Sequence, residues 1–482
     1  MTLRSSLRRC SWSMEVSQRS DMASVTQRSK TDKQDLRRQV TQKIESAGIK
    51  QVRIVTVDMN GVPRAKMLTA DRFLGHTVDH GHAWALPLVA VDIWQNLPDR
   101  TGFGEEIGFG NGLLIPDLSS FRQLPWEPET AHVFCDLVDR DHKPVPTPRQ
   151  VLARVLERAT ALGYEPVFGS ECEFYIFRPV DESKPSNPGF APLQGMQVWF
   201  TDQGLGQMHP LLDQIRRHLV ALEVPVYEIF NEHGGGQYEL NLSPATGLAA
   251  IDAVCLMKIA VKEICYRNGL RATFLGKITN DPEFPVSGYH LHQSLRDRRG
   301  NDVMTDPSGS LGLSDIGRHY VAGVLEHAAG MTAIAAPTVT AYKRFTPGTW
   351  APTRVSWGFD NRTAMLRVVP GTEGLHIENR LASAEANPYL LAAAMTAAGL
   401  DGIERKVEPG EPGSGNLLED AKYPLLPTTM IDAVEAFAKD EMLTAALGKE
   451  FVHIYAALLR YVWKRFLSYV TDWEIQEYRD LL

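Results

Sequence analysis

Four short segments of the chain alternate apolar residues with glutamate or histidine. They read GSECEFYIF at 169–177, NEHGGGQYELNL at 231–242, SGYHLHQS at 287–294 and HIENRL at 376–381. Because alternate side chains of a β-strand share a face, each segment predicts a strand with one apolar and one polar face. The polar faces carry Glu171, Glu173, Glu232, Glu239, Asn241, His290, His292, His376, Glu378 and Arg380.

The residue types on these faces indicate a metal site. A single polar face is most simply a solvated surface, but such surfaces are rich in Lys, Thr and Gln, whereas these four are rich in Glu and His. Neighbouring carboxylates repel each other, and a bound cation relieves the repulsion. Carboxylates with imidazole and no thiolate suit a hard divalent ion, Mg²⁺ or Mn²⁺. Zinc fits less well, because the sequence has no HExxH motif and no CxxC pair.

Two further segments, YKRFTPGTWAPTR at 342–354 and GFDNRTAMLRVV at 358–369, are rich in cations. With the strand residue Arg380, the cations are Lys343, Arg344, Arg362, Arg367 and Arg380. Acids that hold Mg²⁺ beside converging arginines are what phosphoryl transfer requires, because the protein there mainly positions groups and neutralises developing charge. The alternative interpretation of the same residues is an ion-pair network on the surface.

Length and composition narrow the class of protein. A chain of 482 residues has room for two or three domains with a large core. Its net charge of −8 gives no support to a nucleic-acid partner, and no apolar run approaches the roughly 18 residues that cross a bilayer. The five cysteines favour reduced thiols. We therefore expect a cytoplasmic protein without a nucleic-acid or membrane partner.

The first part of the chain predicts a tail and a small domain. Residues 1–34 are rich in Ser and Arg and predict a disordered tail, with a transit peptide or an upstream start codon as alternatives. The small domain, 35–130, should begin with a helix near Asp35 and continue with a hairpin that turns at Asn60-Gly61. The Gly-rich stretch 102–112 is expected to be a loop, because its spacing is not GxGxxG.

A larger domain is expected over residues 131–482. Its first helix should have Thr147 as N-cap and Pro148 at its first position. Further helices are predicted over 251–268 and 316–335.

Six segments in this order resemble the signatures of the class I glutamine synthetase superfamily: GSECEFYIF, NEHGGGQYELNL, SGYHLHQSL, YKRFTPG, DNRTAMLRVV and ENRLASAEANPYLLAAAMTAAGLDGIE. The resemblance spans about residues 52–482. It implies an α+β fold with an N-terminal β-grasp domain and a larger catalytic domain, whose curved antiparallel sheet is flanked by helices. It also implies a homo-oligomer, a dodecamer of stacked hexameric rings, with each active site shared between neighbouring subunits.

The resemblance also implies roles for individual residues. One metal site is matched by Glu173, Glu232 and Glu239, and the other by Glu171, His290 and Glu378. Positions near ATP are matched by His292 and Ser294, the arginines that hold glutamate by Arg344 and Arg380, and those that steady the transferred phosphate beside ATP by Arg362 and Arg367. The cofactors would be Mg²⁺ or Mn²⁺, two or three ions per site. In the implied reaction ATP phosphorylates the γ-carboxylate of L-glutamate, and an amine then displaces phosphate.

Four places depart from ordinary glutamine synthetase. An Asn-Gly-Ser-Gly loop is here 285–288 (PVSG), an arginine is His376, an acidic loop residue is Trp350, and the aspartate that binds ammonium falls near Ala85. These departures resemble the γ-glutamyl-amine ligases, such as the γ-glutamylputrescine and γ-glutamylanilide synthetases. We expect Trp350, with Ala85 and Trp84 of a neighbouring subunit, to line a pocket for an aromatic or otherwise apolar amine.

Other functions remain open at this point. The acceptor could instead be a polyamine, ethanolamine or a short alkylamine, or it could be ammonia, as in glutamine synthetase itself. The remaining alternatives are an inactive structural relative and a metal-dependent hydrolase or decarboxylase on the same scaffold.

Overall fold

The computed structural model describes residues 30–180, 190–281, 283–346, 348–371 and 374–482. Most of the expected tail therefore lies outside the described residues. Helix α1 (Lys30–Ala47) begins inside the range 1–34, so the tail ends earlier than predicted. Beyond α1 the described chain is organised around two sheets, one of six strands and one of nine.

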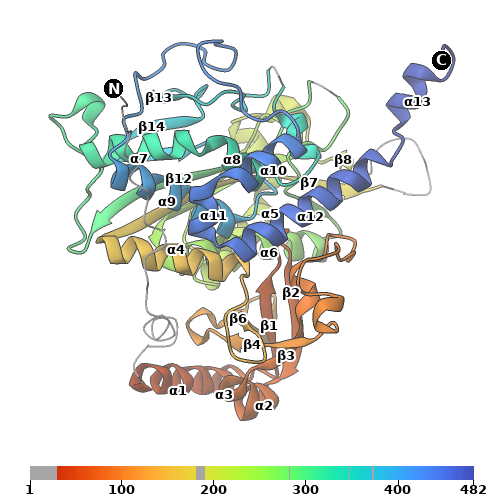
Figure 1. The fold of residues 1–482 in the computed structure, drawn as a ribbon. Helices are drawn as coiled ribbons and strands as arrows, with labels where there is room; N and C mark the ends of the chain where they lie inside the picture. The colour runs from red at the N-terminus through yellow and green to blue at the C-terminus, as the bar shows by residue number, and fades with distance from the viewer. Residues whose placement is uncertain (1–29, 181–189, 282, 347, 372–373) are drawn as a thin grey trace.

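The first sheet and α1 form a small domain, coloured red and orange at the bottom of Figure 1. Its strands are β1 (Gln51–Val57), β2 (Pro63–Thr69), β3 (His82–Ala85), β4 (Asn111–Pro116), β5 (Arg122–Leu124) and β6 (Glu127–Val138). They lie in the order β2-β1-β6-β4-β3, with β5 beside β6. The β1–β2 hairpin is antiparallel as predicted, whereas β1 and β6 are parallel, which gives the β-grasp arrangement. Short helical turns, α2 (Ala70–Arg72) and α3 (Val78–His80), follow β2.

Strand β6 corrects the domain boundary expected at residue 130. It continues to Val138 and pairs with β1, β4 and β5, so the first sheet extends past that point. An alternating pattern identifies a strand but does not name its partner strand, which is why the sequence misplaced the boundary. The larger domain begins with α4 (Pro148–Leu162), where Thr147 and Pro148 occupy the predicted positions. Thr147 is the N-cap residue by position, but its hydroxyl donates to Gln150 Oε1 at 2.8 Å and makes no hydrogen bond to a backbone N–H of the first turn.

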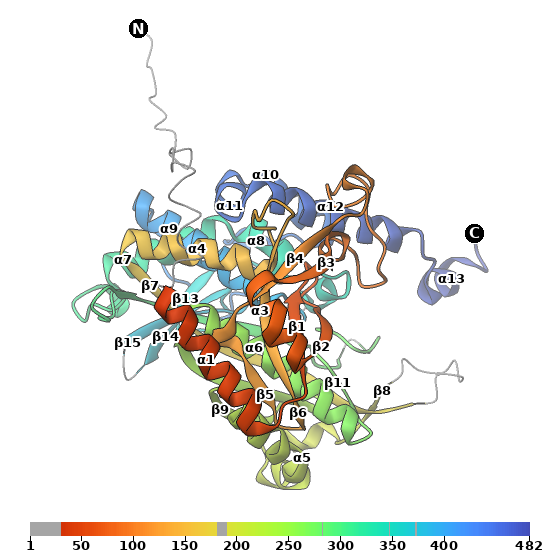
Figure 2. The same cartoon turned by 90° about the horizontal axis from the view of Figure 1, so that it is seen from below.

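The second sheet is the frame of the larger domain. Its strands are β7 (Tyr164–Pro179), β8 (Phe190–Pro192), β9 (Val226–Asn231), β10 (Gln237–Thr246), β11 (Arg271–Thr273), β12 (Tyr289–Asp297), β13 (Trp357–Phe359), β14 (Leu366–Gly371) and β15 (Gly374–Asn379). Their order is β13-β14-β15-β12-β7-β10-β9, with β8 and β11 beside β7. All pairs except β13–β14 are antiparallel. Seen from below in Figure 2, β13, β14 and β15 lie at one side of the molecule and β8 and β11 at the other.

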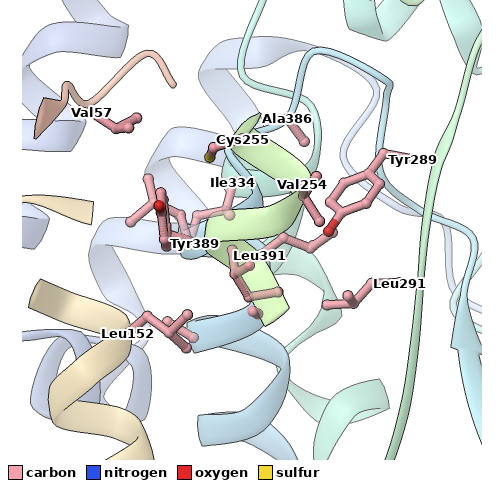
Figure 3. Close-up of a cluster of buried hydrophobic side chains, with 14 of the residues drawn as sticks. Val57, Leu152, Val254, Cys255, Tyr289, Leu291, Ile334, Ala386, Tyr389 and Leu391 are labelled. Carbon is pink, nitrogen blue, oxygen red and sulfur yellow. The ribbon is translucent and has the colours of Figure 1, made fainter. Parts of the chain in front are cut away.

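Helices cover the apolar face of this sheet. The helices of this domain after α4 are α5 (Asp202–Ala221), α6 (Gly247–Arg267), α7 (Asp315–Glu326), α8 (Ala328–Ala335), α9 (Pro388–Arg405), α10 (Met430–Lys439), α11 (Glu441–Leu447), α12 (Lys449–Leu467) and α13 (Asp472–Tyr478). Of these, α13 has no buried residue and does not cover the sheet. Every residue of α9 from 388 to 402 is buried. Figure 3 shows Tyr389 and Leu391 of α9 in one cluster with Val254 of α6 and Tyr289 of β12. The apolar alternation of the strands therefore fixes which sheet face is core and leaves the Glu/His face open.

The predicted helix 316–335 is two helices. α7 ends at Glu326 and α8 starts at Ala328, with His327 between them in a non-helical conformation. Both ring nitrogens of His327 contact acids, Asp440 Oδ2 at 2.8 Å and Asp401 Oδ2 at 3.2 Å. Apolar periodicity continues across the break, so the sequence pattern gave no sign of it.

Buried polar contacts join the two domains. Arg149 of α4 contacts Asp117 at 2.7 Å and Asp136 at 2.9 Å in the small domain, and Asp252 of α6 at 2.9 Å. The β1–β2 turn meets the start of α9, where Asn387 donates to the Asp58 carbonyl at 3.2 Å. In the described residues no single helix is long and apolar enough to cross a membrane. Taken together, the sharply bent pair α11 and α12 has the length and composition of a span, and these two properties are all that suggests one.

Candidate active site

The predicted acids and histidines occupy neighbouring strands at matching registers. On β7, Glu171 stands opposite His290 of β12, and Glu173 stands opposite Glu239 of β10. On the other side of β12, His292 stands opposite Glu378 of β15. Cross-strand partners on one face lie about 4.5–5.5 Å apart at Cβ, so this register converts four separate sequence patterns into one cluster.

Glu171 is the centre of one group of possible ligands. Its carboxylate lies 3.0 Å from Nδ1 of His290 and 2.8 Å from Nε2 of His292. Nδ1 of His290 is also 3.5 Å from Glu378, and ligand atoms of Glu171, His292 and Glu378 lie within 4.8 Å of one another. The structure thus brings together Glu171, His290 and Glu378, which the resemblance grouped, and adds His292 to them.

A second group consists of three carboxylates, Glu173, Glu232 and Glu239. Burial raises the pKa of Glu173 to about 8, and the charge of Glu232 adds to the rise. Burial raises the pKa of Glu239 to about 10, and the charges of Glu171 and Glu173 contribute. Burial also raises the pKa of Glu232, and the N–H of His233 offsets this only in part. The negative charge of these carboxylates is poorly compensated, and a divalent cation would supply the compensating positive charge.

The donor set therefore fits a hard divalent ion. It consists of carboxylate oxygens and imidazoles, and burial followed by the charge of Arg380 lowers the pKa of His290 and keeps its ring neutral, as metal ligation requires. Gln237 helps to hold the Glu173 carboxylate in position, because its amide donates to that carboxylate at 3.1 Å and to the Val286 carbonyl at 3.0 Å. Gly288 must be small here, because a Cβ would lie 2.8 Å from both His290 Nε2 and Arg344 Nη2.

Arg344 and Arg380 are buried cations with unused donors. Arg344 is the last residue of the short helix Thr340–Arg344, is 3% exposed, and donates to the carbonyls of Leu381 at 3.0 Å and Arg380 at 3.3 Å. Among the described residues Arg344 makes no ion pair, whereas Arg380 pairs with Glu378 at 2.5 Å. The Nε atoms of both arginines are buried without a hydrogen-bond partner among these residues. Burial lowers the pKa of the Arg344 guanidinium to about 10, which still leaves it charged at neutral pH. A buried guanidinium without an acid suits an anionic ligand.

The other two arginines differ from each other. Arg367 of β14 contacts Asp360 at 2.6 Å and Glu378 at 3.1 Å, so acids already neutralise it. Arg362, in the turn before β14, is exposed and makes no ion pair with the described residues. It lines a surface hollow with Trp350, Phe359 and the loop 412–415. Ser294 lies on β12 beyond His292, on the same face of the strand by alternation.

The three residues that were expected to line the acceptor pocket differ in how far they are exposed to solvent. Trp350 is 59% exposed, adopts φ of 59°, and shares its hollow with Arg362. Ala85 is half-buried at the end of β3. Trp84 is only 2% exposed within the small domain, so it is part of that core and cannot line a pocket at a subunit boundary. The pattern did not reveal this, because β3 has only four residues and its alternation is too short to identify the buried face.

His376 lies on β15 with its ring centroid 5.1 Å from that of His292, in keeping with its predicted place on the polar face. Sequence reasoning missed Trp199. Trp199 precedes α5 and lies beside Glu232, which is 33 residues further along the chain. The segment QGMQVWF contains no acid or histidine that would mark it as part of the site, so only the folded chain reveals this neighbour.

Comparisons with known proteins agree with this geometry. Residues 146–478 match the family model of the glutamine synthetase catalytic domain. The chain is 35% identical to a γ-glutamylethanolamide synthetase of Streptomyces coelicolor, over 90% of this chain and 93% of that protein. It is 32% identical to a glutamate–isopropylamine ligase of a Pseudomonas species, over 91% and 97%, and 32% identical to a γ-glutamylanilide synthase of an Acinetobacter species, over 94% and 97%.

Solved structures of related proteins also resemble this chain over most of its length. A structure of GmaS without ligand superposes with a TM-score of 0.79 and 31% sequence identity, over 91% of this chain and 98% of that one. A complex of GmaS with ADP gives the same values. With its acid and histidine cluster on a curled sheet and matches over most of its length, this chain belongs to the glutamine synthetase family.

Proposed function

We propose that this chain makes γ-glutamyl amides from L-glutamate and an aromatic or otherwise apolar amine. As a member of this family related to several γ-glutamyl-amine synthetases, it is an ATP-dependent ligase that joins glutamate to an amine. The observation that carries the proposal is a face of buried carboxylates and imidazoles beside two buried arginines whose Nε atoms have no hydrogen-bond partner among the described residues. The identity of the amine is the further step.

Divalent ions would occupy two groups of ligands. We assign Glu173, Glu232 and Glu239 to one site, and Glu171, His290 and Glu378 to the other. Mg²⁺ or Mn²⁺, two or three ions in the whole active site, would supply positive charge to the phosphates of ATP. The raised pKa of Glu173, Glu232 and Glu239 supports this assignment, because these carboxylates ionise readily only when a cation is close.

Arginines would hold the anionic parts of the substrates. We assign Arg344 and Arg380 to the carboxylates of glutamate, because their buried Nε atoms still have a hydrogen bond to donate. Arg362, exposed and without an ion pair among the described residues, would meet the transferred phosphoryl group. Arg367, which Asp360 and Glu378 already bind, would support it, and His292 and Ser294 would contact ATP.

The proposed reaction has two steps. In the first, a γ-carboxylate oxygen of glutamate attacks the γ-phosphorus of ATP, the bond to the bridging oxygen breaks, and ADP leaves. In the second, the amine nitrogen attacks the acyl carbon, the carbon–oxygen bond to phosphate breaks, and phosphate leaves with the bonding electrons. The nitrogen then loses a proton to solvent. Arg362 would act on charge that develops during transfer, whereas Arg344 binds a carboxylate that is charged throughout.

The apolar acceptor is argued from Trp350 and Ala85. A pocket for ammonium or a polyamine needs carboxylates that hold the cation and remove a proton. Trp350 offers an indole face in the hollow that Arg362 shares, and Ala85 has no charge. Relatives named for isopropylamine and anilide support this class, whereas the relative named for ethanolamide keeps a small polar amine as the second candidate.

The test is phosphate release from ATP and glutamate with aniline, isopropylamine, ethanolamine, putrescine and ammonium in parallel. The proposal expects the largest kcat/KM for an apolar amine, and a shift towards cationic amines in Trp350→Glu. A wild-type enzyme that prefers putrescine or ammonium to every apolar amine contradicts it. An unchanged preference in Trp350→Glu would also contradict the role of Trp350.

We also propose a cytoplasmic dodecamer of stacked hexameric rings. The exposed apolar residues near the C-terminus support extensive subunit contacts: Leu467, Tyr469, Val470, Trp473 and Tyr478 are each at least 48% exposed. Helix α13 projects from the body of the chain in Figures 1 and 2. The mass of the purified protein by light scattering decides the matter, and a monomer would contradict the proposal.

A further inference from the structure

Glu385 is a half-buried acid that has no part in the proposed reaction, yet several donors converge on it. Its carboxylate accepts hydrogen bonds from the Gly276 N–H at 2.9 Å and from the Thr338 hydroxyl at 2.8 Å, and the neighbouring Ser383 hydroxyl donates to it as well. The acid thus joins two segments that are far apart in the sequence to the chain between β15 and α9.

The first of these segments is a loop that starts at Gly276 and ends at Ser287, just before β12. The Ser287 N–H donates to the Gly276 carbonyl at 2.7 Å, and the Ala384 N–H donates to the Ser287 carbonyl at 3.1 Å. A Cβ at Gly276 would overlap the Ser383 hydroxyl and lie 2.9 Å from Glu385 Oε2. The two ends of the loop are therefore closed on each other and held in contact with Glu385.

The second segment is the start of the short helix Thr340–Arg344. While the Thr338 hydroxyl donates to Glu385, its oxygen accepts from the Ala341 N–H at 3.0 Å. A hydroxyl has one proton and two lone pairs, so donating to the acid leaves its oxygen free to accept from the helix. The contact between Glu385 and Thr338 therefore fixes the start of the helix whose last residue is Arg344.

The side chain of Arg344 packs against the same two pieces of chain. A Cβ at Gly288, just after the loop, would lie 2.8 Å from Arg344 Nη2, and Arg344 donates to the Leu381 carbonyl at 3.0 Å. Burial lowers the pKa of the Arg344 guanidinium to about 10, and the charges of Glu173 and Glu385 act against this fall. Glu385 is thus linked to Arg344 through the helix, through the loop and through its charge.

We propose that Glu385 is a positioning residue for glutamate, which holds Arg344 and the loop 276–288 in the one arrangement that binds the substrate carboxylate. This inference rests on the proposed function, in which Arg344 binds glutamate. A binding group that is already ordered in the free protein loses less conformational freedom when the ligand binds. Without the charge of Glu385, binding of glutamate should therefore weaken, whereas binding of ATP should not.

Three variants test the network. Glu385→Gln keeps the shape of the side chain and removes its charge. Thr338→Val removes the hydroxyl at nearly constant volume, and Thr338→Ser restores it. Glu435→Gln is the matched control, because Glu435 pairs with Arg460 at 2.8 Å where both side chains are exposed. Circular dichroism and the melting temperature of each variant check its folding.

Two measurements are made on each variant. Calorimetry gives Kd for glutamate with Mg²⁺ and a non-hydrolysable ATP analogue present, so this value does not depend on turnover. Phosphate release gives kcat and the KM values for glutamate and for ATP, with the amine of the panel that the wild-type enzyme uses best.

Glu385→Gln should raise both Kd and KM for glutamate about tenfold, because a hydrogen bond to a charged group is lost, and should leave KM for ATP unchanged. Thr338→Val should give a smaller rise, Thr338→Ser should return the values towards wild type, and Glu435→Gln should match wild type. In an Arg344→Ala background, Glu385→Gln should add little, because the guanidinium that it positions is gone.

The contrary outcomes are distinguishable from one another. If Glu385→Gln raises KM for glutamate and for ATP equally, or lowers only kcat, Glu385 supports the domain as a whole and does not position the glutamate site. If its effect is as large in Arg344→Ala as in wild type, it does not act through Arg344. Should Glu385→Gln fail to fold, unchanged glutamate affinity in Thr338→Val overturns the inference. If the wild-type protein does not bind glutamate at all, the proposed function itself fails.

Discussion

Glu239 shows at the residue scale why the acid cluster needs a cation. It is 7% exposed, and burial together with the charges of Glu171 and Glu173 raises its pKa to about 10. The only direct hydrogen-bond donor that the structure gives it, among the described residues, is Asn241 Nδ2 at 2.9 Å. Ionising this carboxylate without metal is unfavourable, so metal binding and folding stability must be coupled.

The first prediction concerns that coupling. Glu239→Gln removes a carboxylate that is repelled by its neighbours, so the metal-free variant should melt a few degrees above metal-free wild type. Added Mg²⁺ should raise the melting temperature of wild type and raise that of the variant much less. Glu129→Gln, in an exposed pair with Lys50, is the control and should respond to Mg²⁺ as wild type does. An equal Mg²⁺ response in wild type and Glu239→Gln would contradict the metal assignment.

The second prediction separates two arginines. Arg362→Ala should lower kcat by about 100-fold, on the order of 3 kcal/mol, with little change in KM for glutamate. Arg344→Ala should mainly raise KM for glutamate, because the carboxylate that it binds is charged in the ground state as well. Steady-state kinetics with varied glutamate measure both effects. The reverse pattern would refute the assigned roles.

At the scale of elements, much of the site could be predicted, because a strand has a strict period of two. Cys172, Phe174 and Ile176 are buried while Glu171 and Glu173 lie on the other face, as the alternation indicated. The pattern could not give the registers that set Glu171 opposite His290, because register depends on partner strands far away in sequence. It also could not place Trp199, whose contact with Glu232 arises from loop docking.

The break between α7 and α8 leads to the third prediction. Burial opposes a proton on His327, but hydrogen bonds and charges from Asp401 and Asp440 prevail and raise its pKa to about 9. Because the folded pKa lies above the unfolded value, this stabilisation is complete below about pH 6.5 and is lost as pH rises through about 9. His327→Gln should therefore lower the melting temperature at pH 6 by several degrees and much less at pH 10. A difference that is equal at both pH values would contradict this account.

At the scale of the whole molecule, one arginine ties the two domains together. Arg149 is 3% exposed and contacts Asp117 and Asp136 of the small domain and Asp252 of the large one. The sequence predicted the helix that carries Arg149 but not this role, because its partners come from three distant segments. The contact fixes where the small domain, with Ala85, stands relative to the catalytic sheet.

The fourth prediction follows from that contact. Arg149→Met leaves three carboxylates near one another without a cation, so it should lower the free energy of unfolding by about 3–5 kcal/mol. Arg158→Met on the same helix is the control: its pair with Glu404 is half-exposed and should contribute less than about 1 kcal/mol. Thermal and urea unfolding measure both variants. A loss for Arg149→Met no larger than for Arg158→Met would contradict the account.

The most direct test of the central claim follows oxygen from glutamate to phosphate. The enzyme is given ATP, an apolar amine and glutamate labelled with ¹⁸O in the γ-carboxylate, and the released phosphate is analysed by mass spectrometry. If the γ-carboxylate attacks ATP and the amine then displaces phosphate, each phosphate carries one labelled oxygen and one γ-glutamyl amide forms per phosphate. Unlabelled phosphate, or phosphate released without amide, would mean that water attacks ATP and that the chain is not an amide-forming ligase.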